Sequence, residues 1–136
     1  MNFLNSLINV VLLMGLCIGG YFYFTSPKDY GPPPNDAWFQ SAVIGQSEPV
    51  LVKFGADWCG PCRMMEPVLD QFAARVGGRV GVVRVDVDQH PTLAAHYGVS
   101  AIPHLLLFHH GKVVADRVGS ADMEQLRAWI AAHAQN

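Results

Sequence analysis

The sequence contains few cysteines: three among 136 residues. A small disulfide scaffold would need more of them, and a Cys₄ zinc site would need four ligands. Runs of five or more Lys or Arg residues are also absent, and the formal net charge is −2. No internal repeat is found. These absences argue against a disulfide-stapled domain, a zinc ribbon, a repeat array and a nucleic-acid-binding protein.

The segment from Phe3 to Phe24 contains no charged residue. As a helix it would be roughly 33 Å long at ~1.5 Å per residue, about the thickness of the hydrocarbon core of a bilayer. A cleaved signal peptide would have a basic residue before the apolar run and small residues after it, but aromatic residues stand at its end. We therefore expect residues 1–25 to form a single-pass transmembrane anchor that is not cleaved, with residues 3–24 in the membrane.

Two properties of this anchor stay open at the level of sequence. Gly15 and Gly19 form a G-x-x-x-G motif that would favour a helix–helix dimer, although glycine is common in membrane helices. Lys28 is the only basic residue near either end and favours a cytoplasmic domain. The general use of short N-terminal anchors favours the extracytoplasmic (periplasmic) face, to which we give preference. Residues 26–35, with four prolines, predict a stiff linker.

Residues 36–136 have the pattern of one α/β domain. Apolar runs and amphipathic segments alternate and predict, in order, a helix at 36–43, a strand at 50–56, a helix at 59–76, a strand at 80–87, a helix at 92–97, strands at 105–109 and 112–118, and a helix at 122–134. This order predicts a mixed sheet between helices. Pro67 should kink the long helix. The inner face of that helix is expected to carry Met64, Met65, Val68, Leu69 and Phe72.

Two cysteines, separated by two residues, stand where the first predicted strand is followed by a helix, in Trp58-Cys59-Gly60-Pro61-Cys62. At a helix N-terminus, free backbone N–H groups and the helix dipole lower the pKa of the first thiol, whereas Cys62 should be shielded. This asymmetry suits disulfide exchange, in which Cys59 attacks a substrate disulfide and Cys62 resolves the mixed disulfide. Pro61 stiffens the turn, Gly60 leaves Cys59 accessible, and Trp58 forms a wall beside it.

The motif WCGPC resembles the active site of the thioredoxin family. The likeness continues through CRMMEPVLDQFA and VDVDQHPTLAAHYGVSAIPHLLLFHHGKVV, and extends from Asp36 to the C-terminus. It implies a thioredoxin fold and a thiol–disulfide oxidoreductase, expected to be a reductase of protein disulfides. The resemblance implies no cofactor beyond the cysteine pair, and a separate reductase or oxidant as partner. It also implies a cis bond between Ile102 and Pro103, and a substrate groove along Trp58, Ile102, Pro103 and Gly119.

The chain departs from the family pattern at its beginning and in its first strand. The stretch DYGPPP replaces the usual first strand, so we expect a sheet of four strands. Lys53 stands where the family keeps a buried acid, and Arg84 matches the acid's basic neighbour, which predicts two basic groups and no acid. Lys53 can reach to solvent, carry protons as a partly neutral amine, or stay charged and stabilise a thiolate. We hypothesise that it makes this protein less reducing than an ordinary thioredoxin.

Two other departures lie near the expected substrate groove. His104 follows the cis-proline, where Thr is usual, and we interpret it as a solvated residue at a strand end. Gly55 stands where Trp is common. Two other functions stay open, a non-enzymatic assembly factor with this fold and a copper or zinc carrier that binds through C-x-x-C. The intact C-G-P-C motif argues against the first, and Pro61 and the missing third ligand argue against the second.

Overall fold

The computed structural model describes residues 28–134. The expected anchor, with Gly15 and Gly19, and the first residues of the expected linker lie outside the described residues. Between residues 28 and 134, no helix is long and apolar enough to cross a membrane. The anchor and the domain boundaries therefore stay predictions from the sequence.

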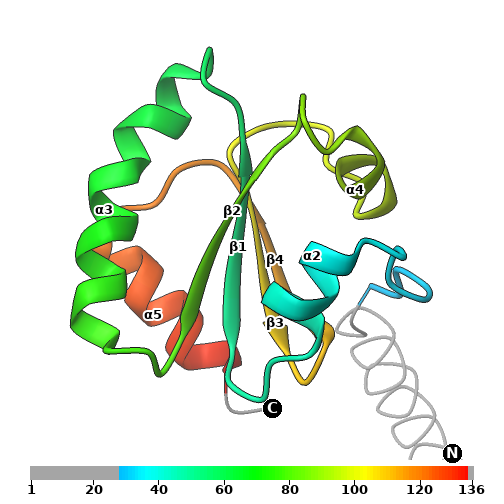
Figure 1. Cartoon of the computed structure of the whole chain (residues 1–136). Coiled ribbons are helices and arrows are strands. Elements are labelled where there is room, and N and C mark those ends of the chain that lie inside the picture. Colours follow the sequence, from blue (N-terminus) through cyan, green and yellow to red (C-terminus); the bar gives the residue numbers. More distant parts are fainter. Residues whose placement is uncertain (1–27, 135–136) are drawn as a thin grey trace, which may run out of the picture.

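A four-stranded mixed sheet forms the centre of the domain (Figure 1). Its strands are β1 (Val50–Gly55), β2 (Gly81–Asp86), β3 (His104–His109) and β4 (Lys112–Val118), in the order β2-β1-β3-β4. β1 pairs with β2 in parallel and with β3 antiparallel, and β3 and β4 form the expected hairpin. Residues 28–36 contain no strand, which agrees with the expected loss of the family's first strand.

Helices cover both faces of this sheet, as the order of predicted elements indicated. α3 (Gly60–Val76) and α5 (Met123–His133) lie on one face. The other face is covered by α2 (Ala37–Phe39), its π-helical continuation η1 (Gln40–Ile44) and α4 (Pro91–His96). Figure 1 shows α3 and α5 on the left of the sheet and α2 and α4 on the right.

The central strand β1 is buried along its whole length because helices cover both of its faces. Leu51 belongs to the core cluster formed with α3 and α5, whereas Val52 and Phe54 belong to the cluster on the opposite face. Alternate side chains of a strand point to opposite faces, so Lys53 is directed toward the α3 side. A rigid strand therefore carries Lys53 and Gly55 to the start of α3.

The long helix differs from the prediction at two places. Cys59 is the N-cap, with an extended backbone, and the helix proper begins at Gly60. Met64 was expected on the inner face but is 79% exposed. The buried positions of α3 recur every three or four residues. Met64 directly precedes the buried Met65, and one residue turns an α-helix by about 100°, so the Met64 side chain lies off the buried face. These buried positions are Cys62, Met65, Leu69 and Phe72.

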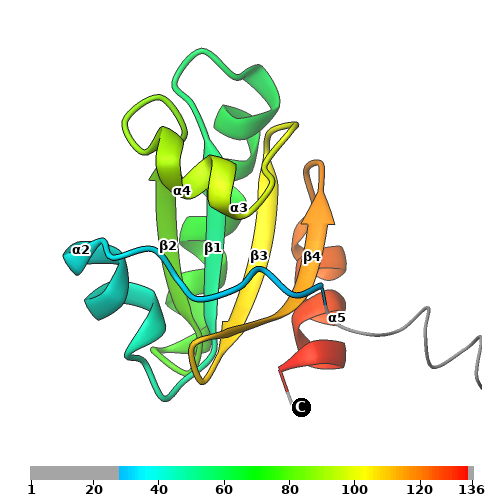
Figure 2. The same cartoon turned by 90° about the vertical axis from the view of Figure 1, so that its right-hand side faces the viewer.

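The segment before α2 runs across the sheet on the side of α2 and α4, from β4 toward α2 (Figure 2). Tyr30 fixes it there, because its hydroxyl donates a hydrogen bond of 2.7 Å to the Asp116 carboxylate on β4. The Tyr30 ring also packs against Tyr97, with 5.4 Å between the ring centroids. The end of the predicted linker is thus part of the folded domain.

Candidate active site

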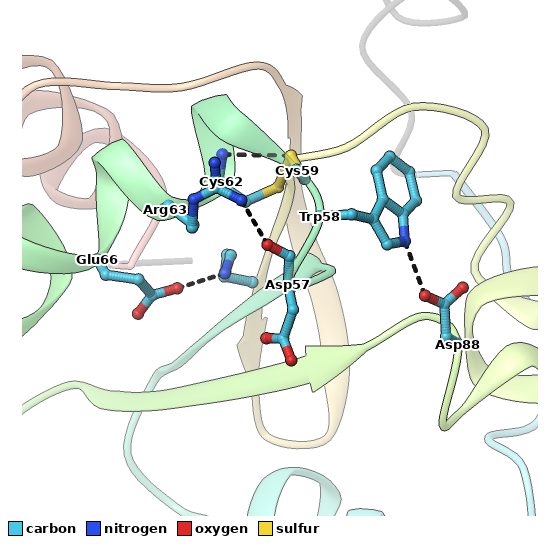
Figure 3. Close-up of a disulfide and its surroundings, with 8 residues drawn as sticks. Asp57, Trp58, Cys59, Cys62, Arg63, Glu66 and Asp88 are labelled. Atoms are coloured by element: carbon cyan, nitrogen blue, oxygen red, sulfur yellow. Dashed lines mark hydrogen bonds and ion pairs between the residues drawn. A yellow bond between two sulfur atoms is a disulfide. The ribbon is translucent and has the colours of Figure 1, made fainter.

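The two predicted redox cysteines form a disulfide at the N-terminus of α3 (Figure 3). Their Cα atoms are 5.2 Å apart. The backbone N–H of Cys62 donates to the Cys59 sulfur at 3.2 Å, so Cys59 caps the helix through its side chain. Cys59 is 5% exposed and Cys62 is 1% exposed. Cys59 is thus the more exposed of the two cysteines, and its sulfur lies at the N-terminus of the helix.

The loop before the disulfide is held by hydrogen bonds on both sides (Figure 3). The Trp58 indole N–H donates to Asp88 at 2.8 Å, and the Arg63 guanidinium donates to the Asp57 carbonyl at 2.7 Å. Trp58 nevertheless remains 67% exposed. This residue therefore offers a large, fixed aromatic surface next to Cys59.

The other residues of the expected substrate groove are Ile102, Pro103 and Gly119, and the structure agrees with part of what the family resemblance implies for them. The bond between Ile102 and Pro103 is cis. Gly119 donates its backbone N–H to the Pro103 carbonyl at 2.8 Å, so these two predicted residues are brought together. Gly119 has a φ of +97°, which few residues other than glycine adopt. The packing of Pro103 against the cysteine pair stays a prediction.

Lys53 is buried beneath the disulfide, with 7% of its surface exposed, so it does not reach to solvent. Its ammonium forms an ion pair with one carboxylate oxygen of Glu66, from α3. The other oxygen of Glu66 accepts a hydrogen bond of 2.6 Å from Arg84, which also contacts Asp70 at 2.6 Å. The expectation of two basic groups without an acid is wrong, because α3 supplies the acid.

The charge of Glu66 is stabilised by its two partners. Burial raises the pKa of Glu66, but the hydrogen bonds from Lys53 and Arg84 outweigh burial and lower the pKa overall. Glu66 is therefore an anion at neutral pH. Sequence reasoning missed this residue, although a signal was available: Glu66 follows Cys62 by four positions and so lies on the same side of the helix.

His104 is 3% exposed, and the expectation of a solvated histidine is wrong. Its Nε2 lies 2.6 Å from the Asp116 carboxylate, which also accepts the hydrogen bond from Tyr30. The residue after the cis-proline is thereby linked to the N-terminal segment. Neither Asp116 nor Tyr30 was selected from the sequence, because their contact depends on how the chain crosses the sheet.

A small cavity of about 260 Å³ lies between the disulfide and the ion pairs. In residues 28–134, no group of three or more His, Cys, Asp or Glu residues is placed to hold a metal ion. The residues that line the cavity include Lys53, Gly55, Cys62, Glu66 and Arg84.

An α/β fold with a C-x-x-C disulfide at a helix N-terminus defines a thiol–disulfide oxidoreductase. Comparison with known proteins agrees. Residues 33–132 match the family model described as Thioredoxin. Thioredoxin of Haemophilus influenzae is 44% identical over 99 residues, which cover 73% of this chain and 92% of that protein. Thioredoxin of Alicyclobacillus acidocaldarius is 46% identical over 96 residues, 71% of this chain and 90% of the relative. This chain belongs to the thioredoxin family.

Proposed function

We propose that this protein is a membrane-tethered reductase of protein disulfides, in which Cys59 is the nucleophile and Cys62 the resolving cysteine. The observation that carries the assignment is the position of the Cys59 sulfur. It caps α3, accepts the Cys62 N–H at 3.2 Å and belongs to the more exposed of the two cysteines. A thiolate at this position is stabilised by the helix N-terminus.

The reaction consists of two exchanges between sulfur atoms. The Cys59 thiolate attacks one sulfur of a substrate disulfide, an intermolecular S–S bond forms, and the other substrate sulfur leaves as a thiolate. Cys62 then loses its proton to water and attacks Cys59. The Cys59–Cys62 bond forms, and the second substrate sulfur leaves with its electron pair. The substrate gains two electrons and two protons, and the protein becomes the disulfide form described here.

Substrate chains would lie along Trp58, Ile102, Pro103 and Gly119. The exposed indole offers apolar contact area, and the turn at Gly119 lies beside the cis-proline. Each turnover leaves the protein oxidised, so the proposed reaction requires an upstream reductase as electron donor. Dithiothreitol serves as that donor in an assay.

The assay for this function is the dithiothreitol-driven reduction of insulin. Wild-type protein should accelerate the reaction, whereas Cys59→Ser and Cys62→Ser should not, because each lacks one half of the redox pair. Asp57→Asn, which retains both sulfurs and the backbone contact to Arg63, is the matched control and should remain active. If wild-type protein does not accelerate the reaction, the assembly-factor alternative takes its place.

The tether is a proposal from residues 1–25, and Gly15 and Gly19 would supply a pairing face for two anchors. Full-length protein should sediment with membranes and resist carbonate extraction, and a chain without residues 1–25 should not. Protease added outside sealed right-side-out vesicles should degrade the domain if it faces the extracytoplasmic side, as we propose. Protection of the domain from that protease would place it in the cytoplasm.

A further inference from the structure

Among the described residues, Lys53 and His104 are the two buried polar or charged ones, and the Lys53 ammonium lies near the sulfur of the resolving cysteine. The evidence is the space beside Gly55. A Cβ atom built on Gly55 would lie 2.9 Å from Lys53 Nζ and 3.2 Å from the Cys62 sulfur. The ammonium and the sulfur therefore both lie beside Gly55, no more than about 6 Å from each other, and the two residues line the same cavity.

Gly55 makes this arrangement possible. A Cβ at that position would also lie 2.7 Å from Lys53 Cε, closer than unbonded carbon atoms approach each other. Because the end of a lysine side chain is flexible, even an alanine at position 55 would push the ammonium away rather than disrupt the strand. The absence of a side chain at Gly55 thus determines where the cation lies.

Glu66 forms an ion pair with this cation. Its carboxylate bridges Lys53 and Arg84, and so joins β1 and β2 to α3. A buried ammonium without a partner would be strongly unfavourable, and would either leave the site or lose its proton. The carboxylate therefore holds the end of the Lys53 side chain in place. Asp70, in contrast, contacts Arg84 alone and is mostly exposed.

We propose that Gly55 and Glu66 are positioning residues of the redox site, which hold the Lys53 ammonium beside Cys62 so that it stabilises the Cys62 thiolate. The proposal rests on the proposed role of Cys62 as resolving cysteine. A nearby cation favours the ionised form of a thiol. In the second exchange Cys62 must lose its proton before it attacks Cys59, so the cation raises the fraction of Cys62 that can react.

The test is the pKa of Cys62, measured from the ¹³Cβ chemical shift of labelled cysteine as the pH is raised. Every variant carries Cys17→Ser and Cys59→Ser in the full chain, so Cys62 is the only thiol that titrates. Glu66→Gln and Gly55→Ala should each raise the Cys62 pKa by about one unit or more, a tenfold change in the ionisation equilibrium. Asp70→Asn, the matched control in the same network, should leave it unchanged.

A double-mutant cycle separates positioning from a direct charge effect of Glu66. Lys53→Met should raise the Cys62 pKa, and adding Glu66→Gln to Lys53→Met should change it no further, because there is no cation left to hold. A Cys62 pKa that falls in Glu66→Gln would overturn the proposal, since Glu66 would then act as a negative charge on the thiol. Additive shifts in the cycle would overturn the proposal as well. An unchanged Cys62 pKa in Gly55→Ala would show that Gly55 is not a positioning residue.

This measurement needs no substrate, so it is independent of the proposed function. A protein inactive toward insulin whose Cys62 pKa shifts as described would contradict the reductase assignment and support the positioning role. An active protein whose Cys62 pKa does not respond to Glu66→Gln would contradict the positioning role alone.

Discussion

Lys53 is the residue that most distinguishes this site from the family pattern. The family has an acid on the central strand, and this chain has a base there with its acid on the neighbouring helix, at Glu66. The replacement of the family's acid by Lys53 places a cation rather than an anion beside Cys62. Electrostatics then favours the thiolate, which belongs to the reduced form of the redox pair.

The reduction potential should therefore respond to Lys53. Lys53→Asp should make the potential of the Cys59/Cys62 couple more negative, because the reduced form loses its stabilising cation. A tenfold change in the exchange equilibrium corresponds to about 30 mV. Equilibration with glutathione buffers of known composition measures this, and Lys53→Met separates loss of the cation from gain of a carboxylate. An unchanged or higher potential in Lys53→Asp contradicts the hypothesis that Lys53 makes the protein less reducing.

At the scale of single elements, patterning predicted the type and order of helices and strands, and the termini depended on local contacts. Cys59 became a cap instead of a helical residue because its sulfur accepts a backbone N–H. Asp36 is the first residue of the helix predicted at 36–43, and its carboxylate caps α2 by accepting the Phe39 N–H at 2.9 Å. The partnership of Lys53 and Glu66 could not be derived from patterning, since it depends on how α3 lies against β1.

The C-terminal helix α5 offers a test of element stability. Asp122 accepts the Gln125 N–H at 2.8 Å, and the Gln125 side chain accepts the Asp122 N–H at 3.2 Å, which forms a capping box. Asp122→Ala should lower the free energy of unfolding by about 1 kcal/mol. Asp122→Asn retains a capping oxygen and should lose much less. Urea denaturation measures both, and equal losses in the two variants would show that charge rather than capping stabilises α5 here.

At the scale of the whole molecule, the sequence and its family resemblance correctly predicted a four-stranded mixed sheet between two helical layers. What they could not predict was how the N-terminal segment crosses the sheet. Tyr30 meets Asp116, far away in the sequence, only because this segment runs over β4. His104 lies on β3, which pairs with β4, and it was assigned to solvent although it is buried and contacts Asp116.

The buried Tyr97, which packs against Tyr30 of this segment, predicts how the stability of the fold depends on alkaline pH. Burial raises the pKa of Tyr97 to about 12, above its ordinary value near 10. Above pH 10 the unfolded chain ionises first and binds fewer protons than the folded protein, so the free energy of unfolding falls as the pH rises toward 12. Urea unfolding at pH 9 and pH 11 should show a smaller fall for Tyr97→Phe than for wild type. Equal falls would mean that Tyr97 does not titrate differently on folding.

The account depends most on the assignment of Cys59 as nucleophile and Cys62 as resolving cysteine. The direct measurement is mass spectrometry of the single-cysteine variants, each with Cys17→Ser, after incubation with an excess of native insulin, whose disulfides are intact. Cys62→Ser, which retains Cys59, should accumulate a mixed disulfide on Cys59, because nothing resolves it. Cys59→Ser should form little adduct, because Cys62 is shielded. Adduct formed preferentially on Cys62, or none on Cys59, would contradict the account.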